Sequence, residues 1–224
     1  MYQNKRAAFY TLGCKLNFSE TSTISRQLKN KGFIITDFDK VADLYVINTC
    51  SVTENANKNC RRIIRKAKEK SPNALIIVTG CYAQLKPKEI TKIEGVDMVL
   101  GANDKFNIPN LLNNLNKKNK AEIHGCEIEN LEYNSAYSLN DRTRSFLKIQ
   151  DGCNYTCSYC TIPFARGKNR SDSIENIVAN AKKIVNQGIK EIVITGVNIG
   201  TYDNKNKTFT NLIKELDKVK GVER

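Results

Sequence analysis

The first 120 residues alternate short β-type runs with helix-type patterns, and this alternation constrains the fold more than any other feature. Apolar runs typical of strands lie at residues 7–12, 44–49 and 75–79, with weaker ones at residues 33–36 and 98–100. Such an order is the signature of a largely parallel sheet with helices packed on its faces. We therefore predict an open α/β sheet domain over residues 1–120.

Residues 51–70 show the helical pattern most clearly. Their apolar side chains fall on one stripe of the expected helix, namely Ala56, Cys60, Ile63, Ile64 and Ala67. A capping box from Ser51 to Glu54 predicts the start of this helix, and Pro72 lies just beyond its end. The segment thus supplies one of the helices that cover the sheet.

The second half repeats the alternation after a polar segment. Residues 121–143 have weak periodicity and many polar groups, so we predict a linker there. Beyond it we expect strands at residues 146–149 and 191–195, and helices at residues 173–187 and 210–219. These two β/α units, over residues 144–224, begin a TIM-type barrel or a doubly wound sheet but cannot close a barrel. Because a further strand should follow where the chain stops, we expect a truncated form of a longer protein.

The charge balance favours a polyanionic partner. Lys and Arg number 36 against 23 Asp and Glu, which gives a net charge of +13. This excess favours RNA or DNA over a membrane, although a Lys-rich surface without a partner is an equally good interpretation. No apolar run approaches the roughly 18 residues of a spanning helix, and no signal-type region follows the start. We therefore expect a cytoplasmic protein, whose eight cysteines are metal ligands, catalytic groups or buried thiols rather than disulfides.

Three cysteines form a C-x3-C-x2-C cluster in the loop after the strand predicted at residues 146–149. Cys153, Cys157 and Cys160 are close enough in sequence to reach one metal centre together. Zinc sites usually take four ligands as two separated pairs, and no nearby fourth Cys or His completes such a set. A tight triplet instead suits a cubane iron-sulfur cluster that has three irons held by thiolates and one left open. Such an open iron can bind a substrate or cofactor.

Three further cysteines share a position rather than a spacing. Cys14, Cys50 and Cys81 each follow the carboxyl end of a predicted strand. In a parallel sheet these ends lie along one edge, where open α/β sheets place their ligands. The three thiols could therefore converge on a second cluster, or they could simply pack as small apolar side chains.

The remaining candidates are weaker. Cys60 lies on the apolar stripe of its helix and is expected in the core, and His124 and Cys126 have no partners at ligand spacing. Residues 195–200 contain two glycines but lack the G-x-G-x-x-G spacing of a dinucleotide site. Their place at a strand end still makes them a plausible lining of a cofactor pocket.

Four motifs together resemble the radical S-adenosylmethionine methylthiotransferases. Besides the C-x3-C-x2-C loop, they are TLGCKLN at residues 11–17, NTCSVT at residues 48–53 and VTGCYAQ at residues 78–84. With IPFARG at residues 162–167, they look most like the branch that modifies N6-threonylcarbamoyladenosine beside the tRNA anticodon. The resemblance implies a methylthiotransferase N-terminal domain at residues 1–120 and the first part of a radical SAM partial barrel at residues 144–224.

The resemblance also implies a mechanism with two 4Fe-4S clusters and S-adenosylmethionine. The cluster on Cys153, Cys157 and Cys160 would cleave S-adenosylmethionine to a radical that abstracts hydrogen from C2 of the modified adenine. A second cluster on Cys14, Cys50 and Cys81 would deliver sulfur, and a second S-adenosylmethionine the methyl group. The cofactors carry the hard chemistry, while the protein orients the pieces and excludes water. Contacts with S-adenosylmethionine would come from Tyr159, Gly196 and Asn198.

The expected partners are the tRNA anticodon loop and a reducing electron donor. Arg61, Arg62 and Arg65 belong to a basic helix that follows Cys50, and we predict that they hold tRNA phosphates. The alternative is a solvated helix face. Alternatives for the whole chain are a methylthiotransferase for isopentenyladenosine in tRNA or for a ribosomal protein aspartate, or an inactive iron-sulfur fragment.

Overall fold

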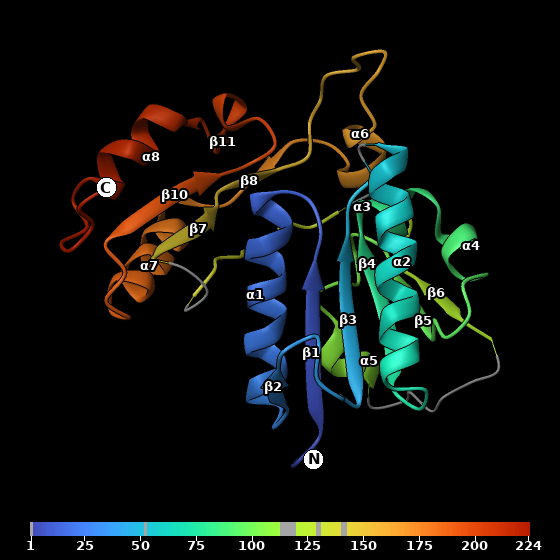
Figure 1. Ribbon diagram of the computed structural model, residues 1–224. Coiled ribbons are helices and arrows are strands. Elements are labelled where there is room, and N and C mark those ends of the chain that lie inside the picture. Colours follow the sequence, from blue (N-terminus) through green and yellow to red (C-terminus); the bar gives the residue numbers. More distant parts are fainter. Residues whose placement is uncertain (1, 52, 113–119, 129–130, 140–142) are drawn as a thin grey trace.

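The N-terminal half is built on a six-stranded sheet in which every pair of neighbours is parallel, as the sequence predicts (Figure 1). The computed structural model describes residues 2–51, 53–112, 120–128, 131–139 and 143–224. The strand order is β2-β1-β3-β4-β5-β6. The strands are β1 (Arg6–Thr11), β2 (Ile34–Thr36), β3 (Leu44–Thr49), β4 (Leu75–Gly80), β5 (Met98–Leu100) and β6 (Glu122–His124). The central strands β3 and β4 are buried on both faces, which explains their nearly continuous apolar sequences.

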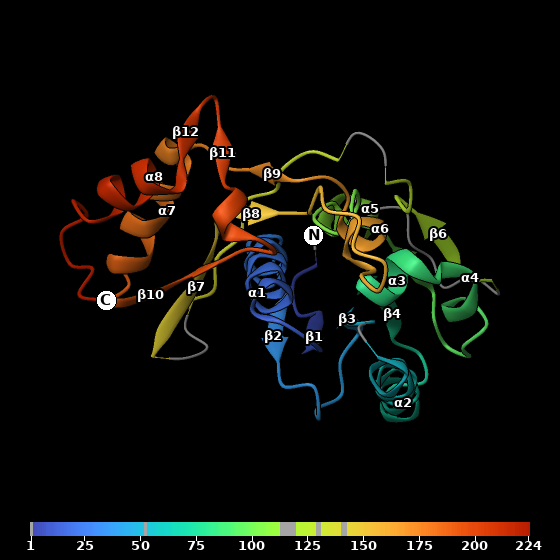
Figure 2. The ribbon, with the colours of Figure 1, turned by 90° about the horizontal axis from the view of Figure 1, so that it is seen from above.

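Helices cover both faces of this sheet. On one face pack α1 (Lys15–Asn30) and α5 (Ile108–Leu111), and on the other α2 (Glu54–Lys70) and α4 (Pro87–Ile90). Figure 2 shows β4 between α2 and α5. The two apolar cores form because side chains along each strand alternate between the faces. The short helix α3 (Cys81–Leu85) begins directly at the end of β4.

The N-terminus of α2 differs from the capping box predicted at Ser51. Thr53 is the N-cap, and its side-chain oxygen accepts a hydrogen bond from the backbone N–H of Ala56 at 3.1 Å. The Ser51 hydroxyl instead bonds the side chain of Asn57 at 3.0 Å. The predicted cap was therefore wrong, because Thr53 is the residue whose extended backbone directs its hydroxyl at a free N–H of the first turn.

The predicted linker contributes a sixth strand. Within residues 121–143, β6 pairs in parallel with β5, with Met98 opposite Glu122. A three-residue strand whose central residue, Ile123, is 41% exposed gives no periodic signal in the sequence. Further along, Tyr137 lies against α1, where its backbone N–H donates to the hydroxyl of Thr23 at 3.2 Å. Part of the segment thus belongs to the sheet domain and part runs along α1.

The C-terminal half contains two parallel strands backed by two helices. Strand β7 (Arg144–Lys148) pairs with β10 (Glu191–Thr195), and α7 (Ile174–Val185) and α8 (Phe209–Leu216) share one apolar core with them. The segments between them are β8 (Gln150–Asp151), α6 (Ile162–Arg166), β9 (Arg170–Ser171), the 3-10 turn Ile199–Thr201, β11 (Asp203–Asn204) and β12 (Lys207–Thr208). This arrangement matches the β/α units predicted from the sequence.

In the part of the chain that the structure describes, helices on both sides bring the two halves into contact. Helix α1 packs along β7, where the rings of Phe18 and Phe146 meet edge to face with centroids 5.7 Å apart. Helix α3 packs against α6. The second contact brings the end of β4 to the segment that follows the C-x3-C-x2-C loop.

Candidate functional site

Cys14, Cys50 and Cys81 follow the carboxyl ends of three adjacent strands. Cys14 is the N-cap of α1 after β1, Cys50 follows β3, and Cys81 opens α3 after β4. Because β1, β3 and β4 are neighbours and parallel, the three turns lie along one edge of the sheet. The sequence predicts this edge correctly. We call these three residues the strand-end cysteines.

Two glycines allow these turns to approach one another. Gly13 has φ +99°, and a Cβ there would lie 2.8 Å from Cβ of Cys50. Gly80 has φ +96°, and a Cβ there would lie 2.3 Å from the carbonyl oxygen of Thr49. Any other residue would meet both an unfavourable backbone conformation and a collision. The glycines before Cys14 and Cys81 therefore serve close packing at this edge.

The other three cysteines lie in the loop between β8 and α6. Cys157 is exposed, and Cys153 and Cys160 are half-buried. The backbone N–H of Cys153 donates to the carbonyl of Gly167 at 3.0 Å, which joins the start of the loop to the residue that caps α6. The backbone N–H of Cys160 donates to the carbonyl of Cys157 at 3.0 Å, which forms a turn. All eight cysteines are free thiols.

The segments next to the two sets meet where α3 packs against α6. A small cavity is lined by Gly80 and Cys81 from one side, by Ala165 and Arg166 from the other, and by Ala102 and Lys105. Burial raises the pKa of the Cys81 thiol, and the charges of Arg166 and Lys105 oppose this shift. Both cations therefore favour the thiolate, which is the form that binds a metal.

The donor chemistry of both sets fits an iron-sulfur cluster, because each offers three free thiols from one edge or one loop. Among the described residues, however, no three Cys, His, Asp or Glu side chains are gathered closely enough to hold a metal ion. Cluster binding would have to draw the thiols of each set closer together.

Three residues predicted to contact S-adenosylmethionine lie on two separate loops. Tyr159 is 89% exposed on the cysteine loop, and Gly196 and Asn198 follow β10. Gln150, which sequence reasoning missed, connects these loops. Its side-chain oxygen accepts from the backbone N–H groups of Val197 and Asn198 at 2.8 and 2.9 Å.

The amide nitrogen of Gln150 donates to the carbonyl of Gly152 at 2.6 Å. The loop after β10 is thereby fixed beside the base of the cysteine loop. Nothing in the sequence around Gln150 indicates this role, because its partners are brought together only by the pairing of β7 with β10.

A buried ion network lies where the two halves meet, and sequence reasoning missed most of it. Glu20 of α1 is fully buried and pairs with Lys105 at 2.7 Å, Lys148 at 3.1 Å and Arg166 at 3.1 Å. Asp151 is 1% exposed and pairs with Lys148 at 2.7 Å and Arg166 at 3.0 Å. We call these five residues the ion network.

The ion network holds three cations against two carboxylates, and Arg170 at its margin adds a fourth cation 3.5 Å from Asp151. Burial alone would raise the pKa of Glu20, but Arg166, Lys105 and Lys148 outweigh burial and hold it far below its ordinary range. Both acids stay ionised for the same reason, since the pKa of Asp151 is also lowered by its cationic neighbours. The excess positive charge faces the cavity at Cys81.

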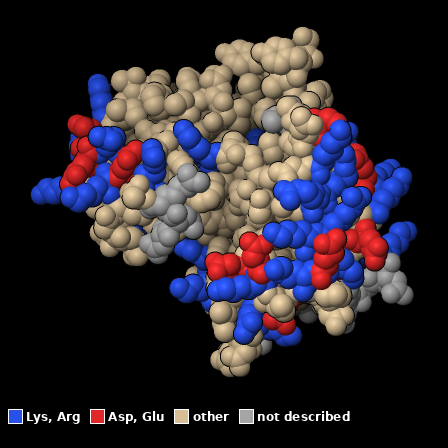
Figure 3. Space-filling view, in the orientation of Figure 1, with Lys and Arg blue, Asp and Glu red and all other residues tan. Residues whose placement is uncertain are grey.

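Helix α2 carries the basic residues that the sequence assigns to tRNA. Figure 3 shows Lys and Arg side chains gathered over α2. Arg62 and Arg65 are exposed on its surface. The guanidinium of Arg61 is instead paired with Glu54 and Glu89, each at 2.8 Å. Arg61 thus joins α2 to α4, a role that the sequence did not indicate.

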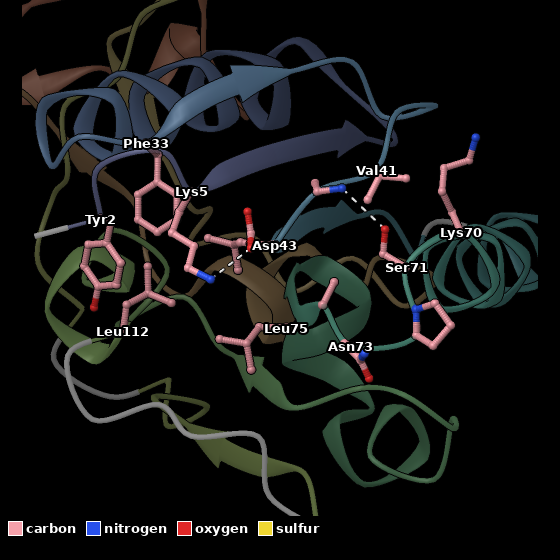
Figure 4. A pocket seen from close by; sticks show the side chains of 14 residues that line it. Tyr2, Lys5, Phe33, Val41, Asp43, Lys70, Ser71, Asn73, Leu75 and Leu112 are labelled. Atoms are coloured by element: carbon pink, nitrogen blue, oxygen red, sulfur yellow. Dashed lines mark hydrogen bonds and ion pairs between the residues drawn. The ribbon is translucent and has the colours of Figure 1, made fainter.

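One sizeable cavity lies away from the cysteines. Its volume is about 570 Å³, and Figure 4 shows it lined by Lys5, Asp43 and Leu75 among others. These residues lie at the amino ends of β1, β3 and β4, whereas the strand-end cysteines follow the carboxyl ends. The cavity therefore takes no part in the site.

Two family matches cover most of the chain. Residues 6–101 match the family described as "Uncharacterized protein family UPF0004", and residues 147–223 match the "Radical SAM superfamily". The second match contains Cys153, Cys157 and Cys160. The C-terminal part of the chain therefore carries a radical SAM domain. The recognition drawn from the sequence motifs is confirmed.

Curated relatives of this chain are named for tRNA modification. It is 42% identical to "Threonylcarbamoyladenosine tRNA methylthiotransferase MtaB" of Bacillus subtilis, with 97% of this chain and 49% of the relative covered. The protein of the same name from Thermotoga maritima is 39% identical, with 97% and 50% covered. A "tRNA-2-methylthio-N(6)-dimethylallyladenosine synthase" of Clostridium botulinum is 36% identical, with 96% and 50% covered. The chain thus spans about half the length of the curated relatives it matches.

A solved structure shares the fold of both halves. The radical S-adenosylmethionine methyltransferase TsrM from Kitasatospora setae superposes with a TM-score of 0.61 at 11% identity, covering 95% of this chain and 51% of its own. This likeness confirms the predicted α/β architecture. Among the described residues, no helix is both long and apolar enough to cross a membrane.

Proposed function

We propose that this chain is the N-terminal part of a cytoplasmic tRNA methylthiotransferase that modifies C2 of N6-threonylcarbamoyladenosine beside the anticodon. The observation that carries the proposal is the contact of α3, which opens at Cys81, with α6, which follows Cys160. Methylthiolation needs a radical and a sulfur donor at the same carbon, so its two sites must be neighbours. The relatives named for this nucleoside support the substrate.

Cys153, Cys157 and Cys160 would hold one 4Fe-4S cluster, and Cys14, Cys50 and Cys81 the other. These clusters, with S-adenosylmethionine, would supply the radical chemistry, the sulfur and the electron taken from a reducing partner. The chain itself supplies charge and position. Lys105 and Arg166 place positive charge beside Cys81. Gln150 bonds both the backbone of Asn198 and the carbonyl of Gly152 at the base of the cysteine loop.

The cluster assignment is tested by iron and sulfide analysis after anaerobic reconstitution. The chain should bind about eight irons, and a variant with alanine at all three loop cysteines about four. The matched control is a variant with alanine at Cys60 and Cys126, which should keep about eight irons. Equal iron in the wild-type chain and the loop variant would overturn the assignment.

The substrate is tested in a strain that lacks the full-length gene. Complementation should restore the methylthio form of N6-threonylcarbamoyladenosine in digested tRNA, as measured by mass spectrometry. Restoration of 2-methylthio-N6-dimethylallyladenosine instead would support the second candidate, which the 36% identity to the Clostridium relatives favours. If the deletion strain still contains both methylthio nucleosides, both substrate assignments are contradicted.

For tRNA contact we propose Arg62 and Arg65, with Arg61 as the residue that holds their helix in place. Alanine at Arg65 should weaken tRNA binding and reduce its salt dependence by about one counterion. Alanine at Arg61 should chiefly lower stability, because it removes the guanidinium that pairs with both Glu54 and Glu89. Filter binding over a salt series distinguishes the loss of a phosphate contact, which changes the salt slope, from a loss of stability. An unchanged salt slope in the Arg65 variant would indicate a solvated face.

A further inference from the structure

Asn17 occupies the centre of the strand-end turns. It belongs to the first motif, TLGCKLN, but it is not among the ligands, and its side chain is fully buried. Its amide nitrogen donates to two carbonyl oxygens, that of Leu12 at 2.8 Å and that of Thr49 at 3.0 Å. Leu12 lies two residues before Cys14, and Thr49 immediately before Cys50. One amide therefore ties together two of the turns that carry the strand-end cysteines.

Thr49 extends the connection to the third turn. Its hydroxyl donates to the carbonyl of Thr79 at 2.5 Å and accepts from the backbone N–H of Ala83 at 3.3 Å. Thr79 precedes Gly80 and Cys81, and Ala83 lies in α3. The three turns are thus joined by side chains in addition to the sheet.

Arg166 connects this arrangement to the other cysteine set. Its Nη2 donates to the amide oxygen of Asn17 at 2.6 Å, while its Nη1 bonds Glu20 and Asp151. Arg166 ends α6, six residues after Cys160, and it is 3% exposed. Because both oxygen and nitrogen of the amide are used, the orientation of Asn17 is fixed from two sides.

We propose that Asn17 is a positioning residue that, held by Arg166, fixes the strand-end cysteines in register with the C-x3-C-x2-C loop. The ligand role of these cysteines rests on the proposed function, but the positioning does not. An aspartate at this place keeps the size and the oxygen facing Arg166 but loses the donor to both carbonyls. Lysine in place of Arg166 keeps the positive charge but loses the second guanidinium nitrogen that reaches Asn17.

The test measures how fast each thiol of the metal-free chain reacts with iodoacetamide, followed by peptide mass spectrometry. Cys50 is 8% exposed and Cys60 is fully buried in α2. The Cys60 thiol donates to the carbonyl of Cys50 at 3.4 Å, but the apolar core around α2 covers it, so alkylation of Cys60 reports loss of that core. N17D should raise the alkylation rate of Cys50 by at least about tenfold, because two buried hydrogen bonds are lost. Cys60 should react at the wild-type rate. R166K should raise the alkylation rate of Cys50 several-fold, although Arg166 lies in α6 and is not part of the six-stranded sheet.

The matched control is N180D. Asn180 is also a buried asparagine, and its amide donates to the hydroxyl of Ser135 at 2.7 Å, remote from the strand-end turns. This variant should leave the alkylation rate of Cys50 at the wild-type value. Wild-type rates at Cys50 in both N17D and R166K would overturn the proposal, as would a parallel rise at Cys60 in both. If N17D does not fold, the R166K result decides.

A second measurement separates this proposal from the proposed function. In the full-length protein, reconstituted N17D should lose about four of about eight irons, while cleavage of S-adenosylmethionine to 5'-deoxyadenosine persists. If N17D speeds alkylation of Cys50 but the wild-type protein binds no iron, the positioning role of Asn17 stands and the proposed enzymatic function is rejected. Eight irons in N17D together with wild-type alkylation would refute the positioning role alone.

Discussion

Removal of the carboxylate at Glu20 should destabilise the protein strongly and in a way that a second substitution reverses. Glu20 is the carboxylate paired with Lys105, whose side chain is 6% exposed. Breaking a buried pair by removing one partner costs about 3–5 kcal/mol. We expect about 3 kcal/mol for E20Q, at the lower end, because the buried amine of Lys105 can release its proton.

The assay is urea unfolding of the 224-residue chain at pH 7, followed by circular dichroism. The double variant E20Q/K105M should recover most of the loss, because it removes the cation that E20Q leaves unpaired. The control E191Q breaks an exposed pair with Arg144, whose closest atoms are 3.4 Å apart, and should cost under about 1 kcal/mol. A loss below about 1 kcal/mol in E20Q, or no recovery in the double variant, would refute the reasoning.

The same substitution carries a pH signature. The folded pKa of Glu20 is lowered from its ordinary value of 4.5, because Arg166, Lys105 and Lys148 outweigh the burial that would raise it. A lowered folded pKa stabilises the protein above the unfolded value, and this contribution disappears as the pH falls. The difference in unfolding free energy between wild type and E20Q should therefore have its full size above about pH 4.5 and decrease as the pH falls below that value. A gap that stays constant down to the acid transition would contradict the assignment.

Two further outcomes follow from the turns and the thiols. Alanine at Gly80 should lower the unfolding free energy by about 2–3 kcal/mol or more, because it adds a collision with Thr49 to a strained backbone. Alanine at Gly188, which has φ +81° but open space around it, should lower it by about 1 kcal/mol. Urea unfolding of the two variants measures the difference. Equal costs would show that the collision relaxes. Burial raises the pKa of Cys60 to about 11, so iodoacetamide at pH 8 should modify Cys60 at least about tenfold more slowly than the exposed Cys157 in the metal-free chain. Similar rates would contradict the buried position of Cys60.

Much of the fold was predictable because its signals are local. Strand β10 was predicted with the bounds that the structure has. Of the predicted apolar stripe of α2, Cys60, Ile63, Ile64 and Ala67 pack in the core, and Ala56 is only partly buried. The α2 cap and β6 were not predicted correctly. At the cap, Ser51 and Thr53 offer the same hydroxyl chemistry, and only the backbone path distinguishes them. For β6, pairing with β5 creates a strand that its own three residues do not specify.

For the candidate site, the sequence by itself determined the two cysteine sets, because parallel strands must place their carboxyl ends on one edge and a short loop must keep its thiols together. Only the tertiary structure decided the rest. Glu20 meets Lys105 and Lys148 across 85 and 128 residues of sequence, and Arg61 pairs with Glu89 rather than facing solvent. Local patterns specify backbone conformation, whereas the partners of a buried charge depend on which segments the topology packs together. For that reason the sequence predicted the cysteines, but it did not predict that Asn17 and Arg166 position them.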